Sequence, residues 1–195
     1  MDKPLVECVP NFSEGRDQTV IDSIVQPIID SPNVTLMDID MGSDFNRTVV
    51  TMVGDPEAVL RTVIQCTGIA LELIDMRNHS GEHARMGAVD VVPFIPISNV
   101  SMSECVDLSR RYAIAVSKQF SLPVYLYANS AVTDQRIRLP DIRKGEYEGL
   151  QEKISSDEWI PDYGPAKFMP TMGATASGAR NLLIACLLYT SPSPR

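Results

Sequence analysis

Residues 75–90 read DMRNHSGEHARMGAVD, and this stretch separates the two patterns that define the centre of the fold. Before it, apolar residues recur at helical spacing from about 56 to 74, and after it an apolar run at 89–97 is typical of a buried strand. Gly81 and Gly87 interrupt regular structure inside the stretch, because glycine adopts backbone conformations that strain other residues. The sequence therefore predicts an ordered loop between a helix and a strand.

This loop holds both histidines of the chain, His79 and His83, within five positions. Histidine titrates near neutral pH, which suits it to proton transfer. The alternative is that a histidine in a polar loop is simply solvated. Two histidines in 195 residues, gathered in one loop, favour a functional site.

On the N-terminal side of the loop, short apolar runs alternate with turns and with helical spacing. The expected elements are a strand at 5–9, a turn at 10–15, a helix at 17–30, a strand at 34–39, a loop at 40–46 and a strand at 48–53. The β-branched residues of the last strand favour that assignment. We expect the histidine loop to lie at a strand end, near the loops at 10–15 and 40–46.

On the C-terminal side, the strand at 89–97 contains Pro93 and Pro96, which predict an edge position or bulges because proline lacks a backbone donor. Ser101 and Glu104 form a capping-box pattern that opens a helix to about residue 120, and a strand at 124–127 follows. Strands with intervening helices indicate an α/β fold: a single mixed β-sheet of five or six strands with helices packed on one face.

The charge of the chain is acidic and unevenly placed. The formal net charge is −8, and residues 1–60 carry eleven acids against three bases. This acidity argues against nucleic acid as a partner. No run has the length of a membrane span, so no membrane partner is expected. The four cysteines are widely spaced, which indicates reduced thiols in a cytoplasmic protein, with Cys8 packing as a small apolar residue rather than acting as a nucleophile.

Two later segments are candidates for function. Residues 136–144 contain four basic side chains, which form either a solvated surface or a binding patch. Residues 159–173 form a long irregular stretch rich in proline and aromatics, and such loops inside compact domains are often functional. The alternative for the second segment is a rigid linker.

Several segments, in order along the chain, resemble the N-terminal subdomain of the formiminotransferase family. The matching segments are VECVPNFSEG (6–15), NRTV (46–49), IDM (74–76), GEHARMGAVD (81–90), PFIP (93–96), PVYLY (123–127), IRKGEYE (142–148) and DYGP (162–165). The resemblance runs from about Leu5 to Ala185. It implies transfer of a formimino group from N-formimino-L-glutamate to tetrahydrofolate, the co-substrate, in histidine degradation.

The family's general acid/base histidine falls on His83, and no metal ion is implied. The folate-binding loop falls on Gly164, Pro165, Ala166, Lys167, Phe168, Met169, Pro170, Thr171, Met172 and Gly173. This chain reads AKFMPTM at 166–172 where the family carries SSFVPSW, so an aromatic is replaced at Met172, while Lys167 favours the glutamate tail of folate. Further candidates for contact with the substrate are Asp40, Arg47, His79, Glu82 and Arg85. Glu82 is a candidate to fix a histidine tautomer.

The resemblance also divides the chain. Residues 1–185 correspond to the N-terminal subdomain, whereas 186–195 have the character of a non-native or truncated tail, and the C-terminal subdomain is missing. We expect the intact enzyme to form a homodimer, with formiminoglutamate and folate as its small-molecule substrates. A different interpretation is a non-catalytic folate-binding or protein-interaction module made of this subdomain alone.

A third interpretation is a zinc site, because His79 to His83 match the pattern His-x-x-Glu-His. That pattern needs both histidines on one face of a helix. Asn78, Ser80 and Gly81 are poor helix formers, which argues against it.

Overall fold

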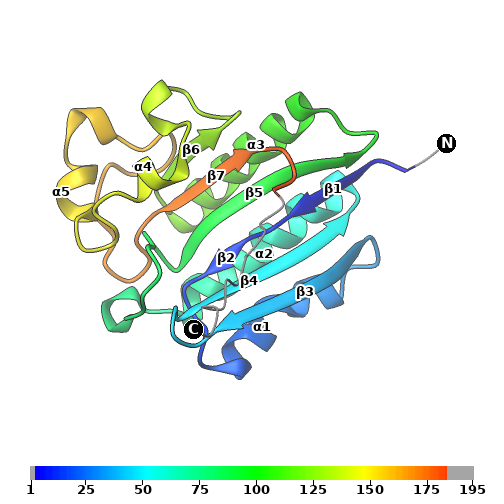
Figure 1. Cartoon of the computed structure of the whole chain (residues 1–195), viewed down its shortest axis with the longest axis horizontal. Helices are drawn as coiled ribbons and strands as arrows, with labels where there is room; N and C mark the ends of the chain where they lie inside the picture. The colour runs from blue at the N-terminus through cyan, green and yellow to red at the C-terminus, as the bar shows by residue number, and fades with distance from the viewer. Residues whose placement is uncertain (1–2, 184–195) are drawn as a thin grey trace, which may run out of the picture.

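A single mixed β-sheet organises the computed structural model, which describes residues 3–183 (Figure 1). The strands are β1 (Leu5–Cys8), β2 (Asn11–Phe12), β3 (Val34–Gly42), β4 (Arg47–Gly54), β5 (Val89–Ser98), β6 (Val124–Ala128) and β7 (Thr175–Ala179). The α-helices are α1 (Gln18–Ile29), α2 (Pro56–Leu73), α3 (Met102–Phe120), α4 (Leu139–Arg143) and α5 (Leu150–Ile154). The predicted α/β class with one mixed sheet is confirmed.

The sheet has an antiparallel half and a parallel half. β3 pairs with β4, and β4 pairs with both β1 and β2, which in turn pair with β5. β7 and β6 then extend the sheet in parallel to β5. Because β1 and β2 lie end to end between β4 and β5, the seven strands occupy six positions, in agreement with the predicted five or six.

The three long helices cover one face of the sheet (Figure 1). Their predicted bounds agree with α1, α2 and α3 to within one or two residues. Each has a side-chain cap at its N-terminus: Asp17 for α1, Asp55 before Pro56 for α2, and the Ser101 capping box for α3. Their apolar faces and the sheet residues beneath them form the main hydrophobic core.

The opposite face is covered mainly toward β6 and β7, where Figure 1 shows α4 and α5. In β6, Val124 and Leu126 belong to the main core, whereas Tyr125 and Tyr127 turn to the other face and pack in a second cluster with Ile142 of α4. On the same face, the side chains of β3 and β4 are more exposed. The histidine loop enters the sheet at the start of β5, between these strands and the covered part.

Three sequence predictions need correction. The segment at 10–15 contains the short strand β2, because the chain resumes pairing after Pro10, whose carbonyl accepts from the N–H of Val50 at 3.0 Å. β5 is an interior strand, so the edge position predicted for the strand at 89–97 is wrong. The bulge alternative is right, since the pairing register with β1 shifts between Leu5 and Val6. The basic segment at 136–144 contains the short helix α4, which was not predicted.

The described cysteines are free thiols. Cys8, Cys66 and Cys105 are buried, and burial raises the pKa of the Cys8 thiol, as expected of a packing residue. Cys186 and the predicted tail at 186–195 lie outside the described residues. Among the helices of residues 3–183, none has the length and hydropathy that a membrane-spanning segment needs.

The capping box of α3 gives a testable contribution to stability. Ser101 accepts from the N–H of Glu104 at 3.2 Å, and its own N–H donates to the Glu104 carboxylate at 2.7 Å. Ser101→Ala should lower the free energy of unfolding by about 1 kcal/mol. The measurement is urea denaturation, with Ser23→Ala inside α1 as the control, for which a change within about 0.5 kcal/mol is expected. Equal effects of the two changes would show that the cap contributes nothing specific.

Candidate active site at the histidine loop

The histidine loop is held against two strand-end loops that are distant from it in sequence. The Ser13 hydroxyl donates to the carbonyl of Gly87 at 2.7 Å, and the Asn46 side chain donates to the carbonyl of Ser80 at 3.0 Å. The loops predicted to flank the histidines therefore lie beside them, and the loop has one defined path across the end of the sheet.

Close backbone contacts explain the two glycines of the loop. A Cβ added at Gly81 would lie 2.3 Å from the carbonyl oxygen of Phe45, and one at Gly87 would lie 2.4 Å from the carbonyl oxygen of Met172. Real side chains do not tolerate such distances, so each position requires glycine. Gly81 thus sets the distance between the histidine loop and β3–β4, and Gly87 sets the distance to the segment before β7.

Asp90, the second residue of β5, is the buried anion of the site, with no exposed surface. Its carboxylate accepts from the N–H of Met86 at 3.0 Å and from the guanidinium of Arg143 at the end of α4. Burial alone would raise the pKa of Asp90, but His83, Arg143 and the Met86 N–H outweigh it and hold that pKa below the usual value. Asp90 is therefore a fixed negative charge inside the protein.

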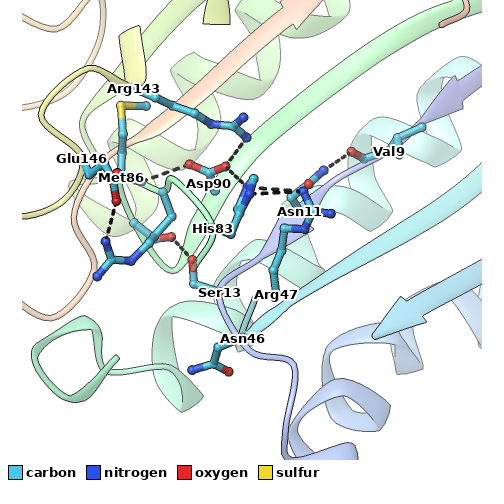
Figure 2. Close-up of polar contacts among 12 residues, drawn as sticks. Val9, Asn11, Ser13, Asn46, Arg47, His83, Met86, Asp90, Arg143 and Glu146 are labelled. Atoms are coloured by element: carbon cyan, nitrogen blue, oxygen red, sulfur yellow. Dashed lines mark hydrogen bonds and ion pairs between the residues drawn. The ribbon is translucent and has the colours of Figure 1, made fainter. Parts of the chain in front are cut away.

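His83 lies between this carboxylate and Arg47 (Figure 2). Its Nε2 is 3.7 Å from Oδ2 of Asp90, and Nη1 of Arg47 lies 3.3 Å from Nε2 and 3.4 Å from Nδ1. An ionised carboxylate only accepts hydrogen bonds, so Asp90 favours the tautomer with its proton on Nε2. The His83 side chain is 17% exposed, which leaves the ring accessible to a ligand.

Arg47, at the start of β4, is held in a partly buried position beside a second arginine. Burial lowers the pKa of Arg47, and the positive charge of Arg143 lowers it further, while Asp40 and Asp90 oppose the change. Asp40 on β3 is exposed and acts on Arg47 only through its charge, with no ion pair between them within residues 3–183. The excess positive charge here suits an anionic ligand.

His79 has different partners from His83. Nε of Arg85 donates to Nδ1 of His79 at 3.2 Å, so Nε2 carries the ring proton and donates to the carbonyl of Asn46 at 2.9 Å. Arg85 is buried and also donates to Glu146 and Glu148, at distances from 2.7 to 3.1 Å. This chain of contacts links the loop to the segment after α4, which gives His79 a structural position.

The remaining predicted site residues are Glu82 and the loop at 164–173. The Glu82 side chain is exposed, and the hydrogen bonds of both imidazoles in the described structure go to other residues. The loop at 164–173 contacts the histidine loop through its C-terminal end: Met76 donates to the carbonyl of Thr171 and Ala88 to that of Met172, each at 2.9 Å. Both assignments remain predictions.

The basic segment at 136–144 does not form one surface patch. Arg136 is buried, and its Nη1 donates to Asp162 at 2.6 Å. It therefore holds the segment before α4 against the irregular stretch at 159–173. Arg143 instead belongs to the site through Asp90. Sequence reasoning did not single out Asp90 and Arg143 as site residues, although a lone aspartate inside the apolar run of β5 was an available signal.

The zinc pattern lacks the helix that it requires. His79 and His83 follow a short 3-10 helix at Met76–Asn78 and lie in an irregular loop, with separate hydrogen-bond partners. Within residues 3–183, no cluster of three or more His, Cys, Asp or Glu side chains is arranged to hold a metal ion.

Known proteins share this sequence over most of its length. The family model described as "Formiminotransferase domain, N-terminal subdomain" matches residues 5–180. Formimidoyltransferase-cyclodeaminase of Dictyostelium discoideum is 51% identical over 181 residues, and that of Rattus norvegicus 52%. Each alignment covers 93% of this chain and 34% of the relative. Glutamate formimidoyltransferase of Streptococcus pyogenes serotype M1 is 45% identical over 181 residues, which cover 93% of this chain and 60% of that protein. The chain therefore spans about a third of the first relatives and three fifths of the last.

The contacts of His79 predict a pH dependence of stability. Burial lowers the pKa of His79 from its usual 6.5, the hydrogen bond to Asn46 opposes this, and the charge of Arg85 adds to it. The folded protein therefore favours the neutral ring. The contribution of His79 to stability is fully present above pH 6.5, and it is lost as the pH falls through the lower pKa that the ring has in the folded protein.

Urea denaturation at about pH 7.5 and about pH 5 tests this expectation. The unmodified chain should lose more unfolding free energy on acidification than His79→Gln, which keeps a polar group but does not titrate. Identical losses would contradict the assignment of a neutral, structural His79.

Proposed function

The chain belongs to the formiminotransferase family as its N-terminal subdomain, and from this premise we propose that it supplies the acid/base side of an enzyme that transfers a formimino group from N-formimino-L-glutamate to tetrahydrofolate. The observation that carries the proposal is the position of His83, accessible to a ligand and placed between Asp90 and Arg47.

The reaction needs one group that first accepts and then donates a proton. A folate nitrogen attacks the formimino carbon and forms a new C–N bond, and it loses a proton as it does so. The bond from that carbon to the glutamate nitrogen then breaks, and the glutamate nitrogen gains a proton. His83 accepts the first proton and returns it to the leaving nitrogen, a form of catalysis that contributes typically about 10²–10⁴-fold.

Asp90 supports this cycle as a positioning residue. With the ring proton on Nε2 and facing Asp90, the lone pair lies on Nδ1, which Nη1 of Arg47 approaches at 3.4 Å. The substrate nitrogen replaces Arg47 at Nδ1 when this atom acts as the base, and the carboxylate stabilises the positive charge that the ring carries between the two transfers. Because Asp90 is also paired with Arg143 and with the Met86 N–H, it cannot rotate away from His83. Its placement resembles that of the aspartate that orients histidine in other proton-transfer sites.

The folate side of the site is assigned to the loop at 164–173. The hydrogen bonds of its C-terminal end, at Thr171 and Met172, with the histidine loop support this proposal. The exposed Lys167 supplies a positive charge for the glutamate tail of tetrahydrofolate. We place the intact enzyme in the cytoplasm, consistent with the free buried thiols of residues 3–183, and expect a homodimer.

Replacing His83 tests the acid/base role. In the protein extended by its natural C-terminal half, His83→Ala should lower formimino transfer by at least about 100-fold, while tetrahydrofolate affinity changes little. The measurement is turnover of formiminoglutamate together with a tetrahydrofolate binding curve. Arg77→Ala is the matched control, because Arg77 is an exposed cation of the same loop that pairs with Asp75. A loss of less than about tenfold in His83→Ala would remove His83 from this role.

A second prediction is that the chain alone does not turn over its substrates. It spans a third to three fifths of its relatives, so much of the surface that positions two substrates belongs to the rest of the protein. Positioning supplies about 7–11 kcal/mol of barriers of this kind. Residues 1–185 and the extended protein should therefore differ by several orders of magnitude in formimino transfer. Comparable rates would show that one subdomain suffices.

A further inference from the structure

A small pocket opens beside Arg47, the residue that contacts His83, on the face of the sheet away from α1, α2 and α3. Its volume is about 280 Å³. Residues of β2, β4, β5, β6 and α4 line it, together with Val9 after β1 and the segment after β7. Three of the lining residues are arginines, Arg47, Arg143 and Arg180, and none of those within residues 3–183 is a carboxylate. The chain as a whole is acidic, with a net charge of −8, so the charge of this pocket is opposite in sign to that of the chain.

Each arginine is placed by a different element and keeps donors available. Arg143 uses one Nη to pair with Asp90, but its Nε is buried and makes no hydrogen bond within residues 3–183. Arg180 follows β7, where its backbone N–H donates to the carbonyl of Phe94 at 3.1 Å. Its Nη1 donates to the carbonyl of the next residue, Asn181, at 3.0 Å, and this leaves the other guanidinium donors for a ligand. Arg47 contacts only the ring of His83 among the described hydrogen bonds of its side chain.

Three like charges around one pocket repel each other. The charge of Arg143 already contributes, after burial, to the lowered pKa of Arg47. Buried polar groups left without partners cost free energy, and an anion in the pocket would offset both costs. Asp90 lies behind Arg143 and neutralises only part of the charge, so the arrangement has capacity for at least one further carboxylate.

The size of the pocket selects between possible anions. A volume of 280 Å³ equals about nine water molecules at roughly 30 Å³ each, which suits an amino acid. It lies just below the range of about 300–1,000 Å³ that is typical of sites for larger ligands. Uncharged and apolar side chains such as Val91, Pro93 and Tyr127 line the remainder and fit a short methylene chain.

We propose that this pocket binds the carboxylates of the free glutamyl substrate, with Arg180 and Arg143 as carboxylate ligands and Arg47 between the pocket and the catalytic ring. The proposal rests on the proposed function and adds the residues that select the substrate. Guanidinium groups bind carboxylates in a planar, bidentate manner. A glutamate held this way directs its nitrogen, and the formimino group on it, toward His83, which Arg47 contacts at 3.3 Å (Figure 2).

Binding to the full chain tests the proposal without turnover. The chain is titrated with L-glutamate and followed by NMR of the arginine side chains. Resonances of Arg47, Arg143 and Arg180 should shift, and Arg180→Gln should weaken L-glutamate binding by about tenfold or more, the usual effect of losing one charge-assisted hydrogen bond. Arg138→Gln is the matched control, because it removes the same charge from an exposed position that does not line the pocket. Equal affinity of both variants would overturn the proposal.

A second ligand separates the two sources of a glutamyl carboxylate. p-Aminobenzoyl-glutamate carries the same carboxylates as the folate tail, and it should bind the pocket more weakly than L-glutamate because its ring exceeds the space available. Tighter binding by p-aminobenzoyl-glutamate, with shifts of the same arginines, would assign the pocket to folate and overturn the proposal.

Kinetics of the extended protein distinguish failure of this proposal from failure of the proposed function. If the unmodified enzyme transfers the formimino group but Arg180→Gln leaves KM for formiminoglutamate unchanged, the function stands and the pocket assignment is wrong. If the unmodified enzyme shows no transfer although L-glutamate binds through Arg180, the proposed function is wrong and the pocket remains an amino-acid site. The expected result is a KM raised at least about tenfold by Arg180→Gln and unchanged by Arg138→Gln.

Discussion

The buried carboxylate of Asp90 is the constraint on which the site depends. A charge without exposed surface is unfavourable unless it is paired and hydrogen-bonded, and Asp90 meets both conditions through Arg143 and the Met86 N–H. These partners come from α4 and from the histidine loop, so a single anion joins β5 to both segments. The pairing of Arg85 with Glu146 and Glu148 joins the same two parts of the chain at the surface. The same charge lies beside the imidazole of His83, so in the mechanism that we propose Asp90 serves both packing and proton transfer.

The two histidines show how neighbouring residues of one type take different positions. His79 has both ring nitrogens satisfied by Arg85 and Asn46, and it helps hold the loop against the end of the sheet. His83 has no such saturated environment and remains accessible, with a fixed anion on one side and a cation on the other. Gly81 fixes the close contact with the β3–β4 loop that keeps this arrangement in register. A rigid loop that leaves one imidazole accessible is suited to proton transfer, because orientation is set before the substrate binds.

Much of the scaffold could be predicted from sequence, because it follows local rules. The apolar spacing of α2 and the capping residues of α3 define those helices almost to the residue. The short strand β2 could not be predicted, because two residues carry no periodic pattern and their pairing depends on β4 and β5 lying on either side. The gathering of the histidine loop with the loops after β1 and β3 was also expected from sequence, and the structure places them together.

The electrostatic part of the site was less accessible to sequence reasoning. Asp90 and Arg143 are 53 residues apart, and their pairing depends on how α4 crosses the sheet, which no local pattern encodes. For the same reason, Arg136 and Arg143 read as one basic segment although the fold directs the first to Asp162 and the second to Asp90. Residue type shows which groups can pair, whereas only the packed structure shows which of them do.

The most direct test of the account is the turnover of Asp90→Asn in the protein extended by its natural C-terminal half. This change keeps the size of the side chain but removes the charge that orients His83. We predict that kcat for formimino transfer falls on the order of 100-fold, while tetrahydrofolate affinity is retained and a urea denaturation curve shows a folded protein. A folded Asp90→Asn enzyme with unchanged kcat would contradict the account, because His83 would then work without the carboxylate around which the site is built.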